Sequence, residues 1–471
     1  MKKTLWKRLL ASVLCLTCLM GDPVMSYAQK DKKTQEERAE EKIKKAALDK
    51  MSKEEPTGPC QTMEELQYQM EAQKKIVPES NKRKDWPKGP MIQADSACLI
   101  DYDSGCLLYA KQADKKQYPA SITKICTALV ALENGKMSDE LTFSADAINC
   151  VPPEYAHIAL NPGEKLSLEE ALYAMMLASA NEVAYGIGEN IGEKTGGGYK
   201  TFLQMMNEKA QSLGCVNTHF ENTNGIYRND HFVSASGMAK IARAAWTYPE
   251  FRKISESESY TIGETNLVDE KRIVHPTHMM YPKNAKYHYG PAVAGKTGFV
   301  FESLCTLVTY AKKDGRTLIA VILRDNGPET YTDTKALFEY GFKEFKNVET
   351  EAKDLVTLPV KEKLSDVKEK PLSKKDGKIA YAYISGETEV GYGEKKENLV
   401  KRVEKKTAKR QKTKKDNTVP EEEKTFQTSL MIKIFLTIAV VLEIVLISIR
   451  NKKKKRHKRK RKSPKGDRSR G

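Results

Sequence analysis

Charge and apolar residues divide this chain into segments that can and cannot fold alone. Residues 29–84 and 395–428 are dense in charge and poor in apolar side chains, so neither can bury enough surface to form its own core. We interpret 29–85 as a charged leader or spacer and 395–428 as an extended charged linker. Trp86 marks the start of the central region, and we expect one domain over residues 86–347.

The formal net charge of +17 is concentrated at the two ends of the chain. The last 21 residues hold thirteen Lys or Arg against one aspartate, and residues 1–28 hold four against one. Only +2 remains for the other 422 residues, and this near-neutral charge does not favour nucleic-acid binding.

Both basic ends match membrane-targeting patterns. Residues 1–28 combine a cationic start, an apolar core and Ser26-Tyr27-Ala28, as is typical of a signal peptide with its cleavage site. Residues 429–450 contain a twenty-residue apolar stretch that is long enough for a transmembrane helix. A lysine-rich tail, 451–471, follows directly. We therefore expect a single-pass protein of the cell membrane, with an extracellular central domain and a cytoplasmic tail beside anionic lipid.

The central region changes from strand-like to helical sequence and back. Mostly helical sequence runs from Ser121 to about Tyr248, and three apolar runs of strand length then precede a last helix, Asp333 to Phe345. This order predicts an α+β fold, in which helices pack on an antiparallel sheet beside a helical subdomain, with the active site in the cleft between the two parts. Residues 348–394 alternate only loosely, and we expect a small β-like segment there.

Ser121-Ile122-Thr123-Lys124 stands at the expected start of a helix. Residues three apart lie on the same helical face, so this spacing places a hydroxyl beside an amine. A serine needs an adjacent base to act as a nucleophile, and lysine serves as that base only when burial or a nearby cation lowers its pKa. Ser121 and Lys124 are therefore a candidate nucleophile and base.

Two further polar motifs follow in the chain. Ser179-Ala180-Asn181 comes after an apolar helix that Ser167 and Glu170 begin with a capping box, so we expect the motif on the turn behind that helix. Lys296-Thr297-Gly298 lies in a strand-like run, where glycine lets a ligand approach the backbone closely. A second copy of the tripeptide, Lys194-Thr195-Gly196, lies in glycine-rich sequence, and we assign it to a loop.

The ordered set S-x-x-K, S-x-N and K-T-G resembles the active-site motifs of the penicillin-recognising serine enzymes. From Gln93 to Phe345 the chain is similar to low-molecular-mass penicillin-binding proteins of the D-alanyl-D-alanine carboxypeptidase type, serine peptidase family S11. The segments Phe220 to Gly225 and Tyr340-Gly341-Phe342, and His231, also fall where this family has similar residues. The resemblance implies the penicillin-binding-protein/β-lactamase-like serine transpeptidase fold, no cofactor, and peptidoglycan stem peptides and β-lactams as partners.

The resemblance also implies catalytic roles. Ser121 would attack the carbonyl of the penultimate D-alanine, Lys124 would take its proton, and Ser179 would relay a proton to the departing D-alanine. The same motifs leave a D,D-endopeptidase, a serine β-lactamase or a catalytically impaired wall-binding or sensor protein open. Class A β-lactamases have aspartate where Ala180 stands, which favours the carboxypeptidase.

Substrate binding is implied for the remaining motif residues. Asn181 would hold the substrate amide, and Lys296 and Thr297 would bind the terminal carboxylate. Gly298 would allow the close approach, and the backbone N–H of Phe299 would stabilise the oxyanion together with that of the nucleophile.

Three positions depart from the family pattern. Residues 328–334 contain no arginine, although carboxypeptidases of this family usually hold the substrate carboxylate with one there. Val300 stands where threonine is frequent, and Gly237 stands where aspartate is usual. These departures leave open how the carboxylate is bound.

Seven cysteines follow the expected cleavage site, an odd number without a C-x-x-C pair. Most lie in apolar sequence, where cysteine behaves as a small core residue, so we expect mostly free thiols. Cys98 and Cys106 flank the first expected hairpin turn and are the one pair for which we consider a disulfide. His275 and His278 have no acidic or cysteine companion nearby, so we expect no metal site.

Overall fold

The structure, a computed structural model, describes residues 23–375 and 378–396. Most of the expected signal peptide and linker, the expected transmembrane segment 429–450 and the basic tail 451–471 lie outside these residues. None of the helices within the described ranges is long and apolar enough to cross a membrane.

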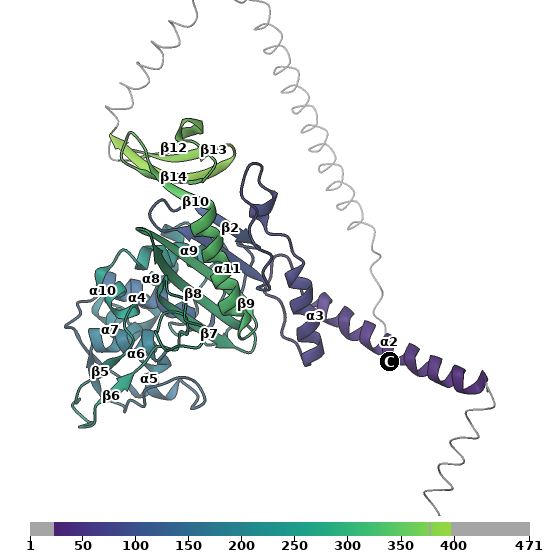
Figure 1. Cartoon of the computed structure of the whole chain (residues 1–471). Coiled ribbons are helices and arrows are strands. Elements are labelled where there is room, and N and C mark those ends of the chain that lie inside the picture. Colours follow the sequence, from purple (N-terminus) through teal and green to yellow (C-terminus); the bar gives the residue numbers. More distant parts are fainter. Residues whose placement is uncertain (1–22, 376–377, 397–471) are drawn as a thin grey trace, which may run out of the picture. The chain divides into compact units, whose positions relative to one another are not determined.

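A five-stranded antiparallel sheet carries the central domain, with the strand order β2-β1-β9-β8-β7 (Figure 1). Its strands are β1 (Ser96–Asp101), β2 (Leu107–Lys111), β7 (Ala292–Val300), β8 (Leu304–Lys313) and β9 (Arg316–Asp325). Asp314 and Gly315 connect β8 to β9 with φ of +51° and +76°, as a two-residue type I′ hairpin requires. The order leaves β7, which carries the K-T-G motif, at one edge of the sheet.

Helices cover both faces of this sheet. Side chains along a strand alternate between its two faces, so successive residues of β1 belong to different apolar clusters. Leu99 belongs to the first cluster, on one face, and Cys98 to the second, on the other face. Helix α11 (Glu329–Glu344) packs into the first cluster, whereas α4 (Lys124–Asn134) and α9 (Ala235–Ala245) pack into the second.

A helical subdomain is inserted between β2 and β7. The expected capping box of Ser167 and Glu170 is present and begins its helix α6. The insertion also contains two short hairpins, β3–β4 and β5–β6. The predicted α+β fold, with helices on an antiparallel sheet and a helical subdomain, is therefore confirmed. The bounds of the inserted elements are β3 Glu140–Thr142, α5 Ala145–Asn149, β4 Lys165–Ser167, α6 Leu168–Leu177, α7 Asn181–Lys194, α8 Gly198–Ser212, α10 Pro249–Ser255, β5 Tyr260–Ile262 and β6 Arg272–Val274.

Residues 345–396 form a second antiparallel sheet, with the order β10-β11-β14-β13-β12. Its inner side shares an apolar cluster with α11 and β2, and Thr357 Oγ1 lies 2.6 Å from Ser104 Oγ in the β1–β2 turn. The segment expected to be weakly β-like therefore consists of strands that pack on the catalytic domain. The strands are β10 Phe345–Glu349, β11 Leu355–Pro359, β12 Val367–Lys375, β13 Lys378–Ser385 and β14 Thr388–Lys396, and a 3-10 turn, Leu364–Asp366, precedes β12.

The interpretation of residues 29–85 as a solvated spacer is wrong for the second half of that segment. Helix α2 (Pro23–Asp49) begins before the segment and ends within it, and the second half contains α3 (Met63–Lys74) and a 3-10 turn, Glu79–Lys82. Buried polar side chains attach it to the catalytic domain: Thr57 donates to Asp95 at 2.5 Å, and Gln69 accepts from Arg324 at 2.8 Å. Composition did not predict this docking, because a polar side chain can be buried without leaving a hydrogen-bonding group unpaired when another part of the chain supplies its partner.

Two side chains, Ser80 near the end of the leader and Trp86 directly after it, cover the free edge of the sheet. The Trp86 indole N–H donates to the main-chain oxygen of Leu108 at 2.9 Å, and Ser80 Oγ accepts from the N–H of Ala110 at 3.2 Å. Both partners belong to β2, the edge strand. These two side chains therefore satisfy hydrogen-bonding groups that an edge strand otherwise exposes.

Candidate active site

Ser121 and Lys124 meet at the junction of a 3-10 turn, Ala120–Thr123, with α4. The Nζ atom of Lys124 lies 3.0 Å from Ser121 Oγ and 2.7 Å from both Asn181 Oδ1 and the main-chain oxygen of Asn224. Burial, and after it the charge of Lys296, holds the pKa of Lys124 well below its usual range. A neutral amine has two N–H bonds and one lone pair, so the two oxygens accept its hydrogens and the lone pair faces the serine hydroxyl.

The backbone around the nucleophile fits only because residue 225 is glycine. Ala120 has a φ of +50° and Gly225 a φ of +90°. A Cβ atom on Gly225 would lie 1.8 Å from the main-chain oxygen of Ala120. Because Asn224 supplies one acceptor for Lys124, the segment from Phe220 to Gly225 belongs to the site. The sequence pattern identified that segment without assigning it a role.

His231 supports the same region without exchanging protons. Its Nδ1 accepts from the N–H of Glu221 at 3.1 Å, so its Nε2 carries the hydrogen and donates to Thr123 Oγ1 at 2.9 Å. Burial lowers the pKa of His231 to about 3. The ring is therefore neutral at physiological pH and fixes the turn that bears the nucleophile.

Ser179 and Asn181 lie between α6 and α7. Ser179 has a φ of +62° and lies on the turn, as expected, whereas Asn181 is already the first residue of α7. Asn181 bridges two parts of the site, because its Oδ1 accepts from Lys124 and its Nδ2 donates to the main-chain oxygen of Ala156 at 2.9 Å. Asn181 thereby connects Lys124 of α4 to Ala156, another residue that lines the cleft.

Lys296 extends from β7 toward this turn. Its Nζ donates to Ser179 Oγ and to the main-chain oxygen of Thr297, both at 2.9 Å. Burial lowers its pKa to about 7. Thr297 Oγ1 lies 2.5 Å from Thr277 Oγ1, a residue that no sequence motif indicated.

Gly298 allows β7 to pass close to the nucleophile. A Cβ atom at this position would lie 2.9 Å from the backbone nitrogen of Ser121 and 3.0 Å from the oxygen of Pro119. Thr306, on the neighbouring strand β8, donates to that same oxygen at 2.7 Å. The motif glycine is therefore required by the packing of the strand against the serine turn.

These residues surround a cleft of about 820 Å³. Six of the eight residues predicted for the site line it, and Lys124 and Lys296 lie buried directly behind it, in hydrogen-bond contact with lining side chains. The six are Ser121, Ser179, Asn181, Thr297, Gly298 and Phe299.

The remaining predicted features lie elsewhere. Lys194 ends α7 and forms an ion pair with Asp139, so the second K-T-G copy is at a helix end. Cys98 and Cys106 are free thiols. Across residues 23–375 and 378–396, no group of three or more His, Cys, Asp or Glu side chains is arranged to hold a metal ion.

Arg324, the arginine nearest to residues 328–334 in the sequence, is turned away from the cleft. It is 1% exposed, and its guanidinium donates to the main-chain oxygens of Glu302 and Gly58 as well as to Gln69. Arg324 therefore ties the leader to the β7–β8 turn and does not line the substrate cleft.

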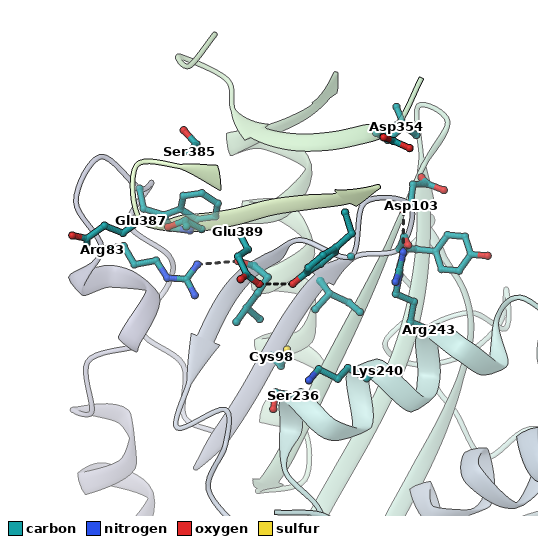
Figure 2. A pocket seen from close by; sticks show the side chains of 18 of the residues that line it. Arg83, Cys98, Asp103, Ser236, Lys240, Arg243, Asp354, Ser385, Glu387 and Glu389 are labelled. Atoms are coloured by element: carbon teal, nitrogen blue, oxygen red, sulfur yellow. Dashed lines mark hydrogen bonds between the residues drawn. The ribbon is translucent and has the colours of Figure 1, made fainter. Parts of the chain in front are cut away.

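A separate cavity, of about 1810 Å³, lies between the second sheet and the catalytic domain (Figure 2). Arg83 of the leader, Arg243 of α9 and Glu389 of β14 line it. Arg243 donates to the main-chain oxygens of Tyr102 and Asp103 at 2.6 and 3.1 Å. None of the residues predicted for the site lines this cavity, so its larger size does not make it the catalytic cleft.

Comparison with known families agrees with this site. The family model of D-alanyl-D-alanine carboxypeptidases, peptidase family S11, matches residues 83–327, and this chain belongs to that family. The matched range contains all three motifs and the segment that carries Asn224.

Individual relatives match the same region. The D-alanyl-D-alanine carboxypeptidase DacF of Bacillus subtilis is 32% identical over 265 residues, which are 54% of this chain and 63% of that protein. A D-alanyl-D-alanine carboxypeptidase of Streptomyces sp. strain K15 is 28% identical over 264 residues, 54% of this chain and 88% of that protein. The match thus spans less than two thirds of the Bacillus relative.

The fold is similar to a solved structure as well. The crystal structure of the Streptomyces K15 DD-transpeptidase superposes with a TM-score of 0.50 at 26% identity and covers 54% of this chain and 99% of that one. The penicillin-binding-protein-like α+β fold is therefore shared by both chains.

Proposed function

We propose that this chain is a serine-type D-Ala-D-Ala carboxypeptidase, which removes the terminal D-alanine from peptidoglycan stem peptides and is acylated by penicillins. The observation that carries the proposal is the 3.0 Å contact between Ser121 Oγ and the buried amine of Lys124. The lowered pKa of Lys124 keeps this amine neutral, so that it can act as the base that a serine nucleophile needs.

In the first half of the reaction, Ser121 Oγ attacks the carbonyl carbon of the penultimate D-alanine, and its proton passes to Lys124 Nζ. The backbone N–H groups of Ser121 and Phe299 stabilise the oxyanion, an effect of about 3 kcal/mol per donor in comparable sites. Ser179 relays the proton held by Lys124 to the leaving nitrogen, so Lys124 becomes neutral again, the C–N bond breaks, and D-alanine departs.

In the second half, water attacks the ester carbon of the acyl-enzyme. Lys124 takes a proton from the water, the shortened peptide leaves, and Ser121 regains its hydrogen. A penicillin acylates the same oxygen, but its leaving nitrogen stays attached to the opened ring. We therefore expect a long-lived penicillin adduct.

The substrate is held on both sides of the reacting carbonyl. Asn181 faces the amide of the peptide, while Lys296 and Thr297 face the terminal carboxylate. The hydroxyl of Thr277 lies 2.5 Å from that of Thr297, so one of them donates to the other and one hydrogen is left for the carboxylate.

We further propose that the protein is anchored in the cell membrane, with the catalytic domain outside the cell and residues 451–471 in the cytoplasm. The sequence patterns at 1–28 and 430–449 support this topology. Protease added to intact cells should degrade the catalytic domain and leave an epitope tag after residue 471 protected. Loss of that tag would contradict the topology.

Intact-mass measurement of the full-length chain mixed with benzylpenicillin tests the activity. We expect one covalent adduct, which Ser121→Ala abolishes, together with D-alanine release from a D-Ala-D-Ala peptide by the wild type alone. Lys296→Ala and Lys194→Ala are a matched pair, because both change the lysine of a K-T-G tripeptide. Only the first should impair acylation. An unmodified wild type, or a modified Ser121→Ala variant, would refute the proposal.

A further inference from the structure

The terminal carboxylate of the substrate carries a negative charge, and of the two buried lysines only Lys296 is partly charged near neutral pH. Lys124 is neutral when it acts as the base. Lys296 has a pKa of about 7 and already donates to Ser179 and to a main-chain oxygen. Lys296 is therefore only partly charged near pH 7 and already uses two of its hydrogens, so a second cation in the cleft would add to its binding of the carboxylate.

Lys286 is the one lysine or arginine among the described residues that line the cleft. It lies on the loop before β7 and is exposed. In the described structure it forms no hydrogen bond or ion pair, and its Nζ lies 5.2 Å from the centre of the Tyr287 ring. Its ammonium group is thus free to meet a ligand.

Aromatic stacking fixes the loop that carries this lysine. Tyr287 stacks on Tyr331 of α11, with ring centres 4.6 Å apart and an angle of 12° between the planes. Tyr331 in turn meets the edge of His278, whose Nε2 lies 2.9 Å from Thr309 Oγ1 on β8. The loop is therefore tied both to the last helix and to the central sheet.

The neighbouring lining residues suit a carboxylate. The hydroxyls of Thr277 and Thr297 line the same cleft as Lys286, and hydroxyl and ammonium groups can both donate hydrogen bonds to a carboxylate. Glu154 is the one acidic side chain in the lining, and no ion pair joins it to Lys286 in the described structure.

We propose that Lys286 binds the C-terminal carboxylate of the substrate, and the equivalent carboxylate of penicillins, and so determines the preference for ligands with a free carboxyl end. This inference rests on the proposed function. Lys286 is then a specificity-determining residue, because it contacts the ligand's carboxylate and takes no part in bond making or breaking.

The test compares benzylpenicillin with its methyl ester, which lacks the negative charge, on the full-length chain. Lys286→Ala should lower the second-order rate of acylation by benzylpenicillin about tenfold, the usual effect of losing a charge-assisted hydrogen bond. Acylation by the methyl ester should stay within about twofold of the wild type, because no charged contact is lost. Lys283→Ala is the matched control, since this lysine lies on the same loop but does not line the cleft.

Two further measurements separate charge from a general effect on the loop. Lys286→Arg should restore most of the benzylpenicillin rate, and added salt should slow the wild type more than Lys286→Ala. With a D-Ala-D-Ala peptide, the alanine variant should raise KM with little change in kcat.

Equal losses for penicillin and its ester, or no loss for either, would overturn the assignment of Lys286 while leaving the proposed function standing. A wild type that penicillin does not acylate would overturn the proposed function, and this inference with it.

Discussion

Replacing Lys296 by methionine should make the protein more stable at acidic pH and less stable at alkaline pH. The side chain is 1% exposed, and burial lowers its pKa from 10.5 to about 7. Since one pKa unit corresponds to about 1.4 kcal/mol, the charged form costs about 5 kcal/mol more in the folded than in the unfolded chain. Methionine removes this cost, but it also removes hydrogen bonds worth about 1 kcal/mol each.

The sign of the effect follows from proton binding. Below pH 7 both the folded and the unfolded chain carry the charge, so the cost is complete. Between pH 7 and 10.5 the unfolded chain binds a proton that the folded chain does not, so wild-type stability rises with pH. We expect Lys296→Met to be more stable than wild type by about 3 kcal/mol near pH 6, and less stable by about 2 kcal/mol above pH 10.

Urea denaturation of both proteins across this pH range measures the difference in the free energy of unfolding. Lys286→Met is the matched control, because it removes the same charge from an exposed position. A pH-independent difference between Lys296→Met and wild type would refute the claim that Lys296 is charged at a cost. The same pH dependence in the control would refute it as well.

Three further predictions concern the surroundings of the site. Gly225→Ala should abolish penicillin acylation, because its Cβ would lie 1.8 Å from the oxygen of Ala120; a rate within about tenfold of wild type would contradict this expectation. Asp325→Asn should be more stable than wild type, and the difference should grow as pH rises above about 4. Burial, and after it Asp333, raises the pKa of Asp325 well above 3.8, so the folded chain retains a proton that the unfolded chain loses. Urea stability curves that run parallel for the two proteins would contradict this expectation. Deleting residues 29–85 should lower Tm by about 5 °C or more. Each lost buried contact to a charged group costs about 2 kcal/mol of stability, and each kcal/mol lowers Tm by about 3 °C. An unchanged Tm would mean that the leader docks without stabilising the domain.

Local rules account for the parts of the site that the sequence predicted. The three-residue spacing of Ser121 and Lys124 brings their side chains together within one turn of helix. The capping box of Ser167 and Glu170 fixes where α6 begins and therefore where the Ser179 turn follows. Resemblance to a family added the roles of these residues, which spacing alone does not give.

The charge states of the site depend on neighbours that are distant in the sequence. Burial, and after it the charge of Lys296, holds the pKa of Lys124 low, and the two oxygens that accept its hydrogens belong to Asn181 and Asn224, 57 and 100 residues away in the sequence. Lys296 meets Ser179 across 117 residues. No local pattern predicts such contacts, because burial and charge proximity arise only when separate elements pack together.

By itself, therefore, the sequence determined the motif order, the kinds of secondary structure and the fold class of residues 86–347, since periodicity and capping act over a few residues. The tertiary structure alone decided that the charged leader docks, that Arg324 faces that leader, and that Lys286 lines the cleft. A polar side chain's position is set by the hydrogen-bond partners that the folded chain offers it, and these partners come from remote segments.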